Sequence, residues 1–167
     1  RDALNSVYWE KWDESIRQEL TFLETKGVWV LTPRPPNTRF LGNRWVFKLK
    51  RKSDGSIERF KSRLVTQGYG LKKGVDYSDS FSYTPRLSTI RLAFAVAASK
   101  KLFLFHADIE TAYLYGEMEG DVYMEQPEGF ADRNKPDLVC KLVKGLYGHP
   151  TAGRQWAEKF KSILSQF

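Results

Sequence analysis

Residues 44–65 read RWVFKLKRKSDGSIERFKSRLV, and this stretch carries the clearest structural signal in the chain. Two runs that alternate apolar with charged residues, 44–50 and 57–65, lie on either side of a short segment that contains Asp54-Gly55. A glycine-containing turn between two alternating runs is the pattern of a β-hairpin. The sequence therefore predicts a basic hairpin over residues 44–65.

Alternation along the two strands separates the aromatic side chains of this hairpin from its basic ones, because successive residues of a strand point to opposite faces. Trp45, Phe47 and Leu49 share one face. The opposite face is expected to carry six cations: Arg44, Lys48, Lys50, Arg59, Lys61 and Arg63. Basic side chains in rows on one face of two paired strands could bind the phosphates of a nucleic acid. The alternative is an exposed hairpin whose cations only keep an edge strand soluble.

The charge of the whole chain is unevenly distributed. The net charge is +7, but residues 39–73 carry +9, from eleven Lys and Arg against two acids, and residues 108–137 carry −7, from nine acids against two cations. A basic segment followed by an acidic one suggests a polyanion held by the first, and a cation or catalytic carboxylates in the second. Two solvated faces with nothing bound would give the same pattern.

Composition limits the class of protein. With 167 residues, 41% of them hydrophobic, the chain can form one domain with a core and is too hydrophobic to be disordered throughout. Its apolar runs fall far short of the roughly 18 residues that a membrane span needs. We therefore expect a soluble intracellular protein, cytoplasmic or nuclear, with no membrane partner. Cys140 is the only cysteine, which excludes an intramolecular disulfide and fits a reducing compartment.

The remaining periodicities predict an α+β fold. Apolar residues at helical spacing predict helices over 7–24, over 89–101 with Ser88 as the cap, and in the tail after Thr151. The apolar stripe of the tail helix comprises Trp156, Phe160, Ile163 and Phe167. Short apolar runs predict further strands at 28–31, 102–109, 122–124 and 138–143.

Asp108 stands out because it lies near the end of the predicted strand 102–109, which is nearly all apolar. A carboxylate there cannot stay buried and ionised unless a metal ion or another cation compensates its charge. Asp108 is therefore a candidate catalytic, metal-binding carboxylate, although an aspartate at a strand end can also simply cap the next turn. Other chemistries are excluded, because the chain has no Gly-x-x-x-x-Gly-Lys, His-Glu-x-x-His or Gly-x-Ser-x-Gly motif.

A series of short motifs follows one another along nearly the whole chain. They are GVWVL (27–31), RWVFK (44–48), RFKSRLV (59–65), GVDY (74–77), DIETAYLYG (108–116), VYMEQP (122–127) and LYG (146–148). In this order, the motifs resemble the N-terminal part of a copia-type retrotransposon reverse transcriptase. Each motif alone would be weak evidence for the family, but the ordered series argues against a chance match.

The resemblance implies an RNA-directed DNA polymerase of right-hand architecture, of which this chain is a fingers and palm fragment with an antiparallel sheet and packed helices. All 167 residues would form one partial reverse transcriptase domain. The expected divisions are fingers-like structure over 1–101, the start of the palm over 102–120, a return to the fingers over 121–148 and a palm helix over 149–167.

Similarity to the family also implies roles for individual residues. Asp108 would be a ligand of the two Mg²⁺ ions used in nucleotidyl transfer, together with the backbone carbonyl of Ile109. Lys61 and Arg63 would contact the incoming deoxynucleoside triphosphate, and Tyr113 would exclude a ribose 2′-hydroxyl. The implied macromolecular partner is a template–primer of RNA or DNA.

Two departures from the family pattern bear on activity. The chain has no Asp-Asp pair, whereas an aromatic-x-Asp-Asp turn supplies the family's remaining metal ligands. Thr151 stands where the family has a glutamine expected to contact the nucleotide. We therefore expect the chain to need the remaining palm, thumb and RNase H segments of a polyprotein, and to be inactive alone. The alternatives are a non-catalytic nucleic-acid-binding remnant of a degenerate or co-opted element, or an unstable product without function.

Overall fold

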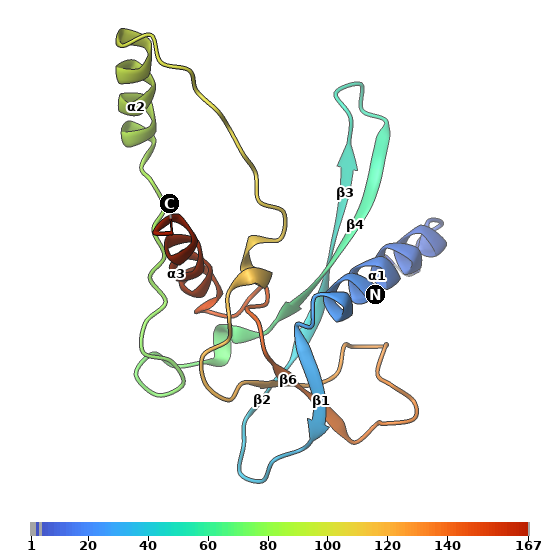
Figure 1. The fold of residues 1–167 in the computed structure, drawn as a ribbon. Coiled ribbons are helices and arrows are strands. Elements are labelled where there is room, and N and C mark those ends of the chain that lie inside the picture. Colours follow the sequence, from blue (N-terminus) through green and yellow to red (C-terminus); the bar gives the residue numbers. More distant parts are fainter. Residues whose placement is uncertain (1–2, 4, 167) are drawn as a thin grey trace.

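A computed structural model describes residues 3 and 5–166, which form a mixed α/β structure. Within these residues there are three α-helices, a four-stranded sheet and a two-stranded sheet (Figure 1). The elements are α1 (Trp9–Thr25), β1 (Trp29–Pro33), β2 (Phe40–Leu41), β3 (Asn43–Arg51), β4 (Ile57–Thr66), α2 (Leu87–Ser99), β5 (Tyr123–Met124), β6 (Leu138–Leu142) and α3 (Ala152–Leu164). Short 3-10 turns cover Gly68–Gly70 and Ala112–Tyr115.

The four-stranded sheet joins segments from both halves of the chain in the order β1-β6-β5-β2. β6 pairs antiparallel with β1 and with β5, whereas the short β2 pairs parallel with β5. One hydrophobic cluster fills the space beside this sheet, and its buried members are Leu23, Val28, Leu41, Leu64, Leu114, Met124, Cys140, Leu142 and Leu146. The predicted strands at 28–31, 122–124 and 138–143 are confirmed to within two residues at each end.

The predicted hairpin is confirmed as β3 paired antiparallel with β4. Lys48 lies opposite Lys61, and Lys50 lies opposite Arg59. Because directly opposite residues share a face, the six cations of the basic face do lie on one side. The turn is closed by hydrogen bonds to Asp54, whose carboxylate accepts from the backbone and hydroxyl of Ser56.

Helix α1 lies beside the hairpin (Figure 1) and packs against its aromatic side chains. The ring of Trp12 packs edge-on against Phe47 and Phe60, with centroids 5.2 and 4.7 Å away. Past the end of α1, Gly27 has φ +61°, a left-handed conformation that glycine adopts without strain. The predicted helix over 7–24, closed by a glycine, is therefore confirmed.

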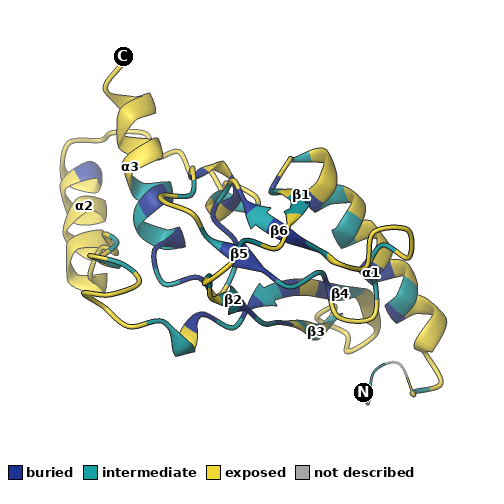
Figure 2. Cartoon of the chain, turned by 90° about the horizontal axis from the view of Figure 1, so that it is seen from below, coloured by how far each residue is buried: buried dark blue, intermediate teal, exposed yellow. Residues whose placement is uncertain are grey.

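The predicted strand over 102–109 is wrong. This segment is irregular, and its apolar side chains are exposed, with Phe103 at 89% and Phe105 at 96% of full accessibility. The helix before it also begins earlier than expected: α2 starts at Leu87, so Ser88 is inside the helix and is not its cap. Ala97 is the one buried residue of α2, and Figure 2 shows the rest of this helix mostly exposed.

The tail helix is confirmed as α3, and Thr151 occupies its N-cap position without making a side-chain cap hydrogen bond. Phe160 and Ile163 of the predicted apolar stripe are partly exposed. Phe167 lies outside the described residues. Within the described part of the chain, no helix has the length and apolar character needed to cross a membrane.

Candidate nucleotide and nucleic-acid site

A cavity of about 440 Å³ lies between β4, the segment 108–113 and Tyr147. One part of its lining is basic and comes from alternate residues of β4. Another part is acidic and comes from the irregular segment after residue 107. The lining residues are Arg59, Lys61, Arg63, Asp108, Ile109, Glu110, Thr111, Ala112, Tyr113 and Tyr147.

The basic part of the cavity is available for an anionic ligand. Among the residues that the structure describes, no ion pair within 4.0 Å involves Arg59, Lys61 or Arg63. Partial burial lowers the pKa of Lys61, and the neighbouring charges of Arg63 and Arg59 lower it further. The repulsion between these cations would be relieved by a bound polyanion, because phosphate oxygens neutralise their charge.

The acidic part of the cavity is built by a chain segment without regular structure. Asp108 and Glu110 are exposed. Thr111 has φ +53°, which is uncommon for a β-branched residue and is a form of backbone strain that is concentrated at functional sites. The 3-10 turn that follows brings Tyr113 to the cavity.

Two tyrosines form the wall that joins the two parts. The rings of Tyr113 and Tyr147 meet edge-to-face, with centroids 5.6 Å apart. The guanidinium carbon of Arg63 lies 4.8 Å from the centroid of the Tyr147 ring, within reach of a cation–π interaction. Burial raises the pKa of the Tyr147 hydroxyl, so this residue stays uncharged at neutral pH.

The cavity brings together five of the residues to which the sequence assigned a nucleotide or metal role: Lys61, Arg63, Asp108, Ile109 and Tyr113. Arg59, expected on the nucleic-acid face, also lines it. The other three cations of that face, Arg44, Lys48 and Lys50, lie on the same side of the hairpin but outside the cavity lining. The roles assigned to all these residues remain predictions.

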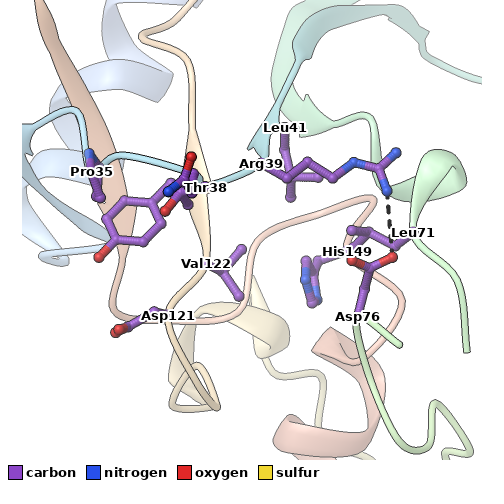
Figure 3. Close-up of a pocket in the computed structure, with 11 residues that line it drawn as sticks. Pro35, Thr38, Arg39, Leu41, Leu71, Asp76, Asp121, Val122 and His149 are labelled. Carbon is purple, nitrogen blue, oxygen red and sulfur yellow. Dashed lines mark hydrogen bonds and ion pairs between the residues drawn. The ribbon is translucent and has the colours of Figure 1, made fainter. Parts of the chain in front are cut away.

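Thr151 is not among the residues that line this cavity. It is buried, and its hydroxyl lies 2.9 Å from Nδ1 of His149. His149 lines a second cavity, of about 430 Å³, beside the ion pair between Arg39 and Asp76 (Figure 3). Contact between Thr151 and a nucleotide therefore stays a prediction, and the position of Thr151 outside this cavity gives it no support.

Comparison with known families bears directly on this arrangement. The family model described as reverse transcriptase (RNA-dependent DNA polymerase) matches residues 26–167. This chain belongs to the reverse transcriptase family. The matched range contains every residue of the cavity and leaves out all of α1.

Relatives of this reverse transcriptase chain are polyproteins of plant transposons. The retrovirus-related Pol polyprotein from transposon TNT 1-94 of Nicotiana tabacum is 41% identical over 151 residues, which is 90% of this chain and 11% of the relative. The Pol polyprotein from transposon RE1 of Arabidopsis thaliana is 37% identical over 98% of this chain, again 11% of the relative. No solved structure gives a significant match. The recognition of a copia-type reverse transcriptase domain is confirmed, and the chain spans about a ninth of these relatives.

Four residues of the cavity were not assigned a role from the sequence: Glu110, Thr111, Ala112 and Tyr147. Glu110 belongs to the acidic stretch 108–137, but the predicted strand would have placed it beyond the strand end. Tyr147 belongs to a quoted family motif, yet only the folded chain places it beside Arg63. The motif was the one available signal for Tyr147, since neither charge nor periodicity marks it.

Reverse transcriptases use divalent metal ions, for which carboxylate oxygens are the usual protein ligands. Among the described residues, no three His, Cys, Asp or Glu side chains are grouped so that they could hold a metal ion. Asp108 and Glu110 alone do not fit the two-ion site, because two-metal catalysis needs ligands for both ions. The described residues therefore supply at most part of such a site.

Proposed function

We propose that this chain forms the fingers and the first part of the palm of an RNA-directed DNA polymerase, and that the cavity receives the triphosphate of the incoming deoxynucleotide. The observation that supports this is the convergence of three cations, none of them ion-paired within the described part of the chain, with Asp108 and Tyr113 in one cavity. A triphosphate carries several negative charges, and closely spaced Lys and Arg side chains are its usual partners in proteins.

In this proposal the parts of the cavity have separate roles. Lys61 and Arg63 neutralise the triphosphate, and Tyr113 forms the wall that a ribose 2′-hydroxyl would meet. Asp108 is this chain's ligand for Mg²⁺, joined by the backbone carbonyl of Ile109 and by carboxylates from outside the chain. The remaining cations of the basic face bind the phosphates of the template–primer without reading sequence.

The exposed apolar residues support a further part of the proposal. Leu92 and Phe94 of α2 and the run 102–105 are largely exposed, and apolar patches of this kind usually mark an interaction surface. We assign this surface to contact with the remaining polymerase segments of the polyprotein. On this assignment, residues 102–120 form the palm only when those segments are packed against them.

The test is primer extension by a polymerase in which this chain is followed by a segment that contains the Asp-Asp turn. Asp108→Asn should reduce extension more than about 100-fold, the scale of losing a group that stabilises the reacting charges. Asp137→Asn is the matched control, because Asp137 is exposed and outside the cavity. The unfolding free energy of the 167-residue chain should change by no more than about 1 kcal/mol in either variant. Full extension by the Asp108→Asn enzyme would refute the metal-ligand role.

A further inference from the structure

Helix α1 lies along the free edge of β4. The Ser15 hydroxyl donates a hydrogen bond to the carbonyl of Phe60 at 3.2 Å and accepts one from the amide of Ser62 at 2.9 Å. These two backbone groups point away from β3, so α1 satisfies hydrogen-bonding groups that an edge strand would otherwise expose. The contact fixes which face of α1 is turned toward the hairpin.

Glu19 lies one helical turn beyond Ser15 on that same face. Four helical residues advance about 6 Å, and two strand residues advance about 6.6 Å, so Glu19 should align with Leu64, two residues after Ser62. The structure agrees, since the backbone amide of Leu64 lies near enough to the Glu19 carboxylate to lower its pKa. Glu19 is half-buried there.

This position places a negative charge behind the basic part of the cavity. Glu19 does not line the cavity, but its charge raises the pKa of Lys61 and of the Tyr147 hydroxyl. Burial raises the pKa of the Glu19 carboxyl, and this effect is opposed by the nearby amide of Leu64 and by the charges of Arg63 and Lys61. Glu19 is therefore a carboxylate held next to two cations that have no ion pair within 4.0 Å among the described residues.

We propose that Glu19 is the resident counter-charge of the phosphate cavity and sets its affinity for a polyphosphate. When the cavity is empty, the carboxylate offsets part of the charge of Lys61 and Arg63. When a polyphosphate binds, Glu19 and the ligand compete for the same two cations, so the carboxylate weakens binding. The inference rests on the proposed function of the cavity, but it assigns a role to α1, which lies entirely outside the family match.

A pH dependence follows from this competition. The charged groups that face Glu19 are Lys61 and Arg63 of β4, with the hydroxyl of Tyr147 behind them. Lowering the pH protonates Glu19 and removes the competing charge, and a bound polyphosphate favours that protonation. Binding should therefore take up protons in the wild-type chain, and less so in Glu19→Gln.

The experiment measures binding of inorganic tripolyphosphate to the 167-residue chain by isothermal titration calorimetry, at several pH values between about 5 and 8. Glu19→Gln has the same size as the wild-type side chain and keeps an oxygen facing the amide of Leu64, so the fold should be preserved. We expect Glu19→Gln to bind about three- to tenfold more tightly at about pH 8, the scale of one partly screened charge pair. The ratio of the two affinities should shrink as the pH is lowered, and the ligand's own titration cancels in that ratio.

The matched control is Glu24→Gln, which makes the same charge change at an exposed position of α1. It should leave affinity and proton uptake unchanged. If Glu19→Gln binds with wild-type or weaker affinity while its melting temperature is unchanged, the inference is wrong. If the wild-type chain does not bind tripolyphosphate, or if Lys61→Gln binds as well as wild type, the proposed phosphate cavity is wrong instead.

Discussion

At the scale of single residues, His149 couples this fold to pH. Burial lowers its pKa from 6.5 to about 4, so the folded chain keeps the imidazole neutral. Between pH 6.5 and 4 the unfolded chain binds more protons at this position than the folded chain, and stability must fall as the pH falls through that range. We expect a loss of up to about 3 kcal/mol from this residue by about pH 4.

Denaturant unfolding at about pH 7 and at about pH 4.5 measures this loss. His149→Gln should flatten the difference between the two unfolding free energies, whatever it does to stability at neutral pH. His106→Gln is the matched control, because His106 is the only other histidine and is exposed. An identical pH dependence in wild type and His149→Gln would show that other groups cause the acid sensitivity.

At the scale of elements, Gly148 holds the segment 146–149 against the end of β4. Its φ of +85° is left-handed, and an added Cβ would overlap the carbonyl oxygen of Thr66. The amide of Thr66 donates to the carbonyl of Tyr147 at 2.7 Å, so the two segments cannot separate without losing this bond. Gly148→Ala should therefore lower the unfolding free energy by more than about 2 kcal/mol, measured by chemical denaturation.

Gly129→Ala separates the two causes of that loss. Gly129 has φ +79°, but nothing lies within 4 Å of an added Cβ. Only the conformational penalty remains there, which is about 1 kcal/mol. Equal losses in the two variants would mean that the contact with Thr66 is not tight.

Elements whose apolar faces are covered within the chain could be predicted closely from the sequence. The hairpin and α1 cover each other through Trp12, Phe47 and Phe60, so alternation and helical spacing matched the fold. The strand over 102–109 was wrong for the opposite reason: an apolar run indicates burial, but nothing in the described part of this chain covers Phe103 and Phe105.

The candidate site was predictable to a similar extent. Alternation alone places Lys61 and Arg63 on one face, because strand periodicity is a local property of the sequence. The position of Tyr147 depends on how a distant segment folds back, and the left-handed backbone of Thr111 depends on packing. No local pattern encodes either feature.

At the scale of the whole molecule, the concentration of cations on one hairpin face predicts how nucleic-acid binding responds to salt. If Arg59, Lys61 and Arg63 all contact phosphates, they contribute about −2.7 to the slope of log affinity against log salt on duplex DNA. Replacing all three with glutamine should remove that part of the slope, measured by fluorescence anisotropy between roughly 50 and 200 mM salt, the range over which such contacts are resolved.

Replacing Arg91, Lys100 and Lys101 with glutamine removes the same charge from exposed positions in and after α2. An unchanged slope is expected for that control. A different outcome is that the protein binds nucleic acid with the predicted slope and yet extends no primer when the Asp-Asp segment is present. That pair of results would favour the non-catalytic remnant. Equal slopes for the two triple variants would show that the salt dependence of binding reflects the net charge of the whole chain and not the position of the three cations on the hairpin.

The length of the short turn around Asp54 and Gly55 determines which face of the hairpin carries the positive charge. Side chains alternate with a period of two, so a shift of β4 by one residue would exchange its two faces. Lys61 and Arg63 would then point toward Trp12, and Phe60 would point to solvent. The number of residues in this turn therefore decides which side of the hairpin is charged, although the turn itself touches neither the cavity nor α1.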